Sequence, residues 1–307
     1  MKKLVIIIFM MTLLGSIPKA EAQVLDPEYG PRAWQKENTK QLEAVTLTHI
    51  READVMWSTR IWRTLDLRQK QNLPLYYPIA DSATLGKRSF IQVIYDEIVA
   101  AVDNPGPNSL RMYNDYQLRN PIPTDQIMSK ILKSDTMDRI IDPVTCEAES
   151  YEEVLDFFTK IKPEIIKVKL MEDWFFDKQR SVMDVRILAL AIEIPIYTSK
   201  VDVDAICGIT VFGGWDIVPN ATTEIWFYFP DLRPTMAANE CYKRSNDAAR
   251  ISFDDIFLKR MFASYIIKEE NVYDRGINEY TNGLDALLEA EKISEKIRDF
   301  EGNFWQY

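Results

Sequence analysis

Residues 165–197 read IIKVKLMEDWFFDKQRSVMDVRILALAIEIPIY and carry the clearest secondary-structure signal of the chain. Charged and apolar side chains alternate along residues 165–171, and residues 181–197 are rich in β-branched and aliphatic side chains. Both patterns are typical of β-strands, in which successive side chains point to opposite faces. We therefore expect two strands, joined by a turn within the polar and aromatic residues between them.

Further along the chain, residues 223–229 continue the pattern with aromatic and β-branched side chains and are predicted to form another strand. Gly213 and Gly214 precede this strand and are predicted to form a turn. Before the hairpin, residues 73–78 contain two prolines and two tyrosines and are predicted to be extended. Together these segments indicate an antiparallel sheet.

Apolar residues at intervals of three and four predict helices on both sides of the strands. Ser150, with Glu153 three residues on, has the pattern of a helix-capping pair. The last helix carries its apolar residues on one side and is predicted to be a C-terminal amphipathic helix. The sequence therefore predicts an α+β fold, with helices at 36–68, 90–102, 124–135, 150–161, 253–270 and from 284 onward.

The first 22 residues are organised like a secretory signal peptide. Lys2 and Lys3 precede an apolar run, and a small-residue cleavage site stands before Gln23. The run is shorter than the roughly 20 residues that a permanent membrane helix needs. We therefore expect an exported, soluble protein without direct membrane insertion.

The remainder is predicted to comprise a helix-rich half, 23–160, and an α+β half, 161–307. The two halves share an ordered series of residues at partly equal spacing, which indicates an internal duplication, with chance recurrence as the alternative. The series begins with Trp57, Arg63, Asp66 and Arg68 in the first half and with Trp174, Arg180, Asp184 and Arg186 in the second.

The composition indicates a folded, acidic protein. Apolar residues make up 47% and aromatic residues 11% of the chain, so it is expected to fold. The formal net charge is -10, and removing residues 1–22 takes away three lysines and one glutamate, which makes the remainder more acidic. Nucleic-acid binding depends on neutralising phosphates with Lys and Arg, so no nucleic-acid partner is expected.

Cysteine and histidine usage predicts no metal, cofactor or redox site. The cysteines Cys146, Cys207 and Cys241 have none of the spacings of a CxxC motif, and the sequence leaves open which of them, if any, form a disulfide. The only histidine, His49, falls in a predicted helix and lacks the cysteine partners of an ordinary zinc site. Two triplets, at Ser82 and Thr136, resemble the acidic–hydroxyl–aliphatic sites of O-glycosylation in Bacteroidota.

The densest polar cluster, EDWFFDKQRSVMDVR at 172–186, raises the question of catalysis. A pair of its carboxylates could serve as the acid and base of a secreted glycoside hydrolase. The alternative is a turn stabilised by salt bridges. The chain has no Gly-rich phosphate loop, and Ser181 has no histidine suited to a catalytic triad. We predict no catalytic residues.

The same cluster carries a resemblance to a known family. Residues 172–186, together with SFDDIF at 252–257, KEENVYDR at 268–275 and LLEAEKI at 287–293, resemble the gliding-motility protein family GldN, called PorN in non-gliding relatives. The similarity extends upstream to DLR at 66–68 and PLYYP at 74–78.

The resemblance implies a non-enzymatic structural component of the type IX secretion system. It also implies a location in the periplasm, where the family forms ring-shaped complexes with the outer-membrane lipoprotein GldK or PorK. Copies of the chain itself, and the inner-membrane components GldL and GldM, are further expected partners. The alternative from another class is a binding module that acts alone as a monomer.

Interfaces in assemblies of this kind rely on aromatic and arginine side chains. Two patches are therefore predicted to contact partners, with ordinary core packing as the alternative for each residue. The first comprises Trp174, Phe175, Phe176 and Arg180, and the second comprises Phe304, Trp305 and Tyr307.

Overall fold

The structure is a computed structural model that describes residues 24–26, 30–32, 43–80, 86–106, 109–142, 147–203, 210–243 and 250–304. Two short strands near the start, β1 (Val24–Asp26) and β2 (Gly30–Arg32), pair antiparallel with each other. The predicted signal peptide lies outside these residues, and no described helix is both long and apolar enough to cross a membrane.

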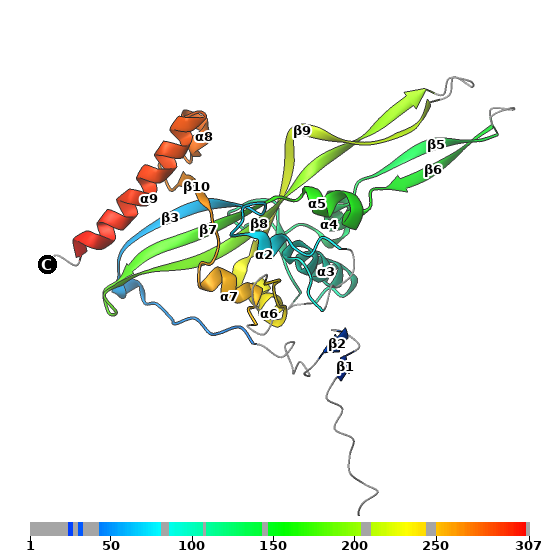
Figure 1. Ribbon diagram of the computed structural model, residues 1–307. Coiled ribbons are helices and arrows are strands. Elements are labelled where there is room, and N and C mark those ends of the chain that lie inside the picture. Colours follow the sequence, from blue (N-terminus) through cyan, green and yellow to red (C-terminus); the bar gives the residue numbers. More distant parts are fainter. Residues whose placement is uncertain are drawn as a thin grey trace, which may run out of the picture.

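The centre of the fold is a six-stranded antiparallel sheet in the order β10-β3-β7-β8-β9-β4 (Figure 1). The predicted hairpin is present as β7 and β8, and the predicted α+β class is confirmed. The sheet takes strands from both sides of residue 160 in the chain. The strands are β3 (Val55–Asp66), β4 (Met112–Tyr113), β7 (Lys167–Asp177), β8 (Val182–Val203), β9 (Thr210–Tyr228) and β10 (Tyr265–Glu269).

Strands β8 and β9 continue beyond the sheet as a long arm, beside the hairpin of β5 (Ser134–Asp142) and β6 (Glu147–Val154) (Figure 1). Ser199 on β8 donates a hydrogen bond to the Asp135 carboxylate on β5 at 2.6 Å. The predicted turn at Gly213 and Gly214 is wrong, because both glycines lie within β9 opposite a register shift in β8. Gly214 has a φ of +120°, which glycine adopts without strain.

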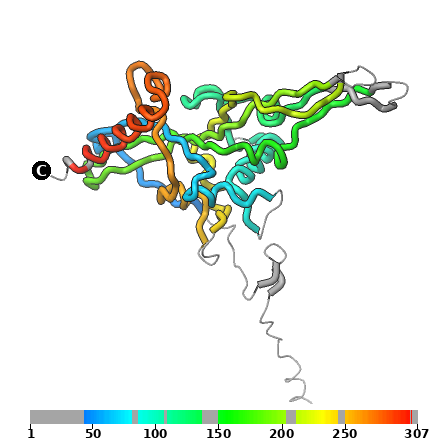
Figure 2. The backbone as a smooth tube through the Cα atoms, turned by 45° about the horizontal axis from the view of Figure 1, so that its top comes forward, coloured from blue at the N-terminus to red at the C-terminus, as the bar shows by residue number. Residues whose placement is uncertain are grey.

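Several helices pack on the sheet around one large apolar core (Figure 2). Phe90, at the start of α3, lies 5.5 Å from the Phe253 ring and 5.3 Å from the Phe257 ring, both on α7. Leu65 and Leu170 on the sheet belong to the same core. The helices are α3 (Phe90–Asp103), α4 (Thr124–Ile131), α6 (Phe229–Ala238) and α7 (Phe253–Leu258).

The predicted C-terminal amphipathic helix is present as α9 (Leu284–Phe304), after the short α8 (Ile277–Tyr280). Its buried residues Ala290, Ile293 and Ile297 pack with Ile61 of β3 and Ile266 of β10 in a second, smaller core.

The predicted helix at 36–68 is wrong, because residues 55–66 form β3. Trp57, Ile61 and Leu65 recur at intervals of four, which fits a helix as well as one face of a strand. The many β-branched and aromatic residues in this segment favour the strand.

Three other predictions need correction. Residues 150–161 form the end of β6 and the π-helical turn η2 (Phe157–Ile161), so Ser150 begins no helix. The helix predicted at 253–270 ends at Leu258, and β10 follows. Residues 73–76 form the short helix α2 (Leu73–Tyr76), where Pro74 occupies the first turn, in which proline is well tolerated.

The two series of residues that indicated a duplication lie on structural elements that do not correspond to each other. Trp57 and Arg63 are both on β3, whereas Trp174 is on β7 and Arg180 lies in the turn after it. One series therefore follows a single strand and the other follows a hairpin. The duplication gains no support from this arrangement.

Candidate partner interface

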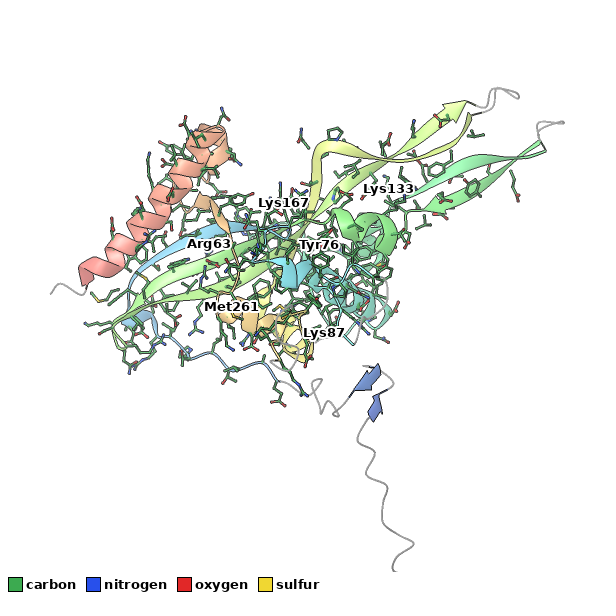
Figure 3. The ribbon with its side chains drawn as sticks, in the orientation of Figure 1. Arg63, Tyr76, Lys87, Lys133, Lys167 and Met261 are labelled. Atoms are coloured by element: carbon green, nitrogen blue, oxygen red, sulfur yellow. The ribbon has the colours of Figure 1, made fainter. Side chains whose placement is uncertain are left out.

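The cluster at 172–186 is held together by arginines. The Glu172 carboxylate is fully buried, at 0% exposure, and accepts two hydrogen bonds from Arg260 at 2.9 and 3.1 Å. Arg63 lies 3.2 Å from the same carboxylate. Trp174 donates its indole N–H to this group at 3.1 Å, and both arginines lie over the Trp174 ring. Figure 3 shows Arg63 on β3.

This arrangement places two arginines against one carboxylate, so one positive charge remains in excess. Burial lowers the pKa of Arg63 from its usual value, and the neighbouring Glu172 acts against that shift.

The tip of the hairpin is also closed by ion pairs. Arg180 binds Asp177 at 2.7 Å and Asp184 at 2.7 Å. Away from the tip, Arg60 on β3 binds Asp173 on β7 at 2.6 Å. The hydrogen bond from Arg180 lowers the pKa of Asp177, opposite to the raised pKa that a general acid needs. These carboxylates therefore form the salt-bridged turn that was the alternative to a catalytic pair.

The first predicted interface patch is divided by the structure. Phe175 and Phe176 are 5% and 6% exposed, which is core packing within the chain. Trp174 is half-buried between two arginines, and Arg180 is engaged in the turn. Contact of these residues with a partner stays a prediction.

Only some of the other predicted site residues are described by the structure. The second predicted patch, Phe304, Trp305 and Tyr307, lies outside the described side chains, as do Ser82, Cys146 and Cys207. Thr136 is exposed on β5, and His49 is exposed in an irregular segment rather than a helix. Cys241 carries a free thiol whose pKa is raised to about 11 by burial.

A second family-like motif, residues 268–275, forms a tightly organised loop between β10 and α8. The Asn271 side chain donates to the carbonyls of Glu269 and Arg275, both at 2.8 Å. Its oxygen accepts from the backbone N–H groups of Tyr273 and Arg275 at 3.2 and 3.0 Å. Asparagine commonly organises turns through such side-chain to backbone bonds. The loop is therefore shaped from within, without a partner.

Further contacts fasten this loop to the sheet. Asp274, with a φ of 54°, accepts hydrogen bonds from Tyr116 and Lys268. Those two bonds lower the pKa of Asp274. The Lys268 ammonium also lies 4.5 Å from the Trp62 ring and 4.6 Å from the Tyr116 ring, a favourable cation–π arrangement.

The ordered loop points its apolar side chains into solvent. Val272 is 99% exposed and Tyr273 is 75% exposed, with Arg275 over the Tyr273 ring at 4.9 Å. We call Val272 and Tyr273 the knob. Further exposed apolar residues lie on the adjoining α8 and the start of α9, namely Tyr280, Leu284, Leu287 and Leu288. A sizeable exposed apolar patch on a soluble protein commonly marks an interaction site.

A shallow hollow of about 200 Å³ lies at α7 and the start of β8. Leu47, Val185, Ile187, Phe257 and Leu258 give it an apolar lining. Arg186, Arg260 and Asp184 stand in the same lining. We call this the α7 hollow.

Sequence reasoning missed both the knob and the hollow. The knob has no periodic pattern, and although residues 268–275 carry part of the family resemblance, the local signal for its shape is Asn271 followed by Asp274 and Gly276, which are turn-forming residues. The hollow brings together segments from 47, 183–187 and 257–260, which no local pattern connects.

Comparison with known proteins gives the chain its family. No curated protein matches it. The sequence profile of the family described as gliding motility associated protein GldN matches residues 50–306, which include the cluster at Glu172, the knob and α9. The chain therefore belongs to the GldN family and is a component of the gliding-motility and type IX secretion machinery.

Proposed function

We propose that this protein is a non-enzymatic scaffold of the type IX secretion system. In this role it lies in the periplasm and forms a ring-shaped complex with the outer-membrane lipoprotein GldK or PorK. The observation that carries the proposal is the family match over residues 50–306. The signal-peptide pattern of residues 1–22 supports the location.

Two features of the described residues support a role carried by surfaces. The most promising carboxylates, Glu172, Asp177 and Asp184, are each bound by arginine. The chain also orders a loop whose apolar side chains, Val272 and Tyr273, lie in solvent. A pre-ordered contact residue loses little conformational entropy on binding, which favours a docking role.

The test is co-expression of the mature chain with the lipoprotein from its own genome, followed by pull-down and negative-stain imaging. We expect a stable complex that appears as rings or arcs. A chain that stays monomeric beside folded lipoprotein would contradict the proposal. A measurable hydrolysis that is lost on Glu172→Gln while urea unfolding shows this variant to be folded, and that is kept on Glu270→Gln, would instead establish the hydrolase alternative.

A further inference from the structure

We propose that the knob of one copy inserts into the α7 hollow of the next copy, so that successive chains join head to tail. This inference rests on the proposed scaffold function and adds the contact between neighbouring copies.

The surroundings of the knob are acidic. Glu270, Asp274 and Glu279 are exposed around it. Lys268 pairs with Asp274, and Lys296 pairs with Glu269. Glu270 and Glu279, against Arg275, leave a net negative charge. The apolar knob is thus set in a rim of negative charge. Complementary charge at the rim of an apolar contact steers association and fixes its register.

The α7 hollow has the opposite character. Its apolar lining is joined by Arg186 and Arg260, against Asp184 alone among its acidic residues. Asp184 lies 2.7 Å from Arg180 and 3.5 Å from Arg186, and Glu172 is shared by Arg63 and Arg260. With Asp177, which also binds Arg180, three carboxylates face four arginines. The hollow therefore presents a net positive charge around an apolar floor, and its 200 Å³ can hold a side chain of the size of tyrosine.

The knob and the hollow lie on separate parts of the molecule. In both Figure 1 and Figure 2 the α8 end and α7 lie far apart, with strands β3 and β7 between them. The knob of a chain is therefore not placed to fill that chain's own hollow. A contact between two different patches of identical chains propagates from copy to copy, and it closes into a ring when the rotation between copies allows closure.

The knob is also preorganised. Asn271 shapes the loop through four hydrogen bonds, and Asp274 ties it to Tyr116 and Lys268. The knob therefore keeps its place without a partner, and ordering it on docking adds little entropic cost.

The experiment replaces Tyr273 with the photo-crosslinking residue benzoylphenylalanine in the full chain, in cells that also make the lipoprotein. Irradiation is expected to yield a product of two chains, with the crosslink mapping to residues 45–50, 183–187 or 256–260. The matched control replaces Tyr77, which is also exposed but distant from the loop, with benzoylphenylalanine. This variant should give no crosslinked product of two chains.

Charge reversal sharpens the test. Arg186→Glu and Glu270→Arg should each lower the two-chain product about tenfold, because each places like charges across the contact. The two changes combined should restore most of the product. An Arg186→Glu chain that loses the product through misfolding would show no recovery on adding Glu270→Arg, so recovery separates contact from folding.

Three outcomes would overturn the inference. They are a crosslink to the lipoprotein, a crosslink between two 270–276 loops, and no crosslink while the lipoprotein still co-purifies with the chain. In each of these cases the scaffold function would stand. Loss of lipoprotein binding by the unmodified chain would instead reject the proposed function itself.

Discussion

The hairpin cluster at 172–186 and the loop at 268–275 are both short segments rich in charged and aromatic residues. They differ in where their side chains lie. In the hairpin, Glu172 and Asp177 are bound by arginines of the same chain. In the loop, one side chain, Asn271, provides most of the internal order and leaves Val272 and Tyr273 in solvent. Composition alone therefore does not tell a cluster whose side chains are bound within the chain from one whose apolar side chains stay in solvent.

Among the variants considered, Glu172→Ala is expected to lower the free energy of unfolding the most. This change leaves Arg63 and Arg260 without their shared carboxylate, and removing one partner of a buried ion pair costs about 3–5 kcal/mol. Urea unfolding should show a loss of that size. Glu270→Ala, at an exposed position of the loop, should change the free energy of unfolding by less than about 0.5 kcal/mol. An equal loss of unfolding free energy in the two variants would contradict the distinction between a hairpin bound within the chain and an exposed loop.

The next effect concerns assembly. Val272→Asp combined with Tyr273→Ser should weaken the affinity between two copies of the chain about 30-fold or more. The reason is that central aromatic contacts contribute about 2 kcal/mol or more to binding. The free energy of unfolding should stay within about 0.5 kcal/mol of the parent, because both side chains are already in water. The measurement is a binding titration beside urea unfolding, with Tyr77→Ser as the control. Unaltered binding would show that the knob is not a contact.

A smaller effect is expected from Asn271→Ala. The loop loses hydrogen bonds to Glu269, Tyr273 and Arg275, and a typical net hydrogen bond is worth about 1 kcal/mol. Hydrogen exchange should report faster opening of residues 270–276, with exchange in β7 and β8 unchanged. Asn278→Ala, an exposed change on the neighbouring α8, is the control. Slow exchange in the variant loop would mean that the order comes from elsewhere.

The smallest expected effect is a change in the pH dependence of stability at the hairpin tip. Arg180→Ala should raise the pKa of Asp177 toward its ordinary value, because the arginine hydrogen bond lowers it. A lowered folded-state pKa stabilises the chain above the ordinary aspartate pKa, and this contribution is lost as pH falls through the lowered value. The variant should therefore lose less stability on acidification than the parent. NMR titration of the Asp177 carboxyl measures the shift directly, and an unchanged midpoint would show that Arg180 does not set this pKa.

The strands β7 and β8 were predictable because their residues alternate over a long span, while β3 was not. In β3, Trp57, Ile61 and Leu65 fit helical spacing, and only pairing with β7 and β10 settles the choice. The false capping pair at Ser150 shows the same limit, since a local motif is overridden by the β5–β6 hairpin.

The proposed contact surface was harder to predict from the sequence than the fold. Phe175 and Phe176 are attractive contact residues in sequence, but their burial follows from the twisted hairpin and its neighbours. The exposure of Val272 depends on a loop conformation that Asn271 sets within a few residues. Its signal in the sequence is therefore a turn motif rather than an apolar pattern.

The most direct test of the contrast between these regions is hydrogen exchange on the chain alone and in its purified assembly. We expect peptides covering 270–276 to become protected on assembly, while those covering 172–181 keep the exchange of the free chain. Protection confined to 172–181, with the 270–276 loop unchanged, would contradict the assignment of the contact to the knob.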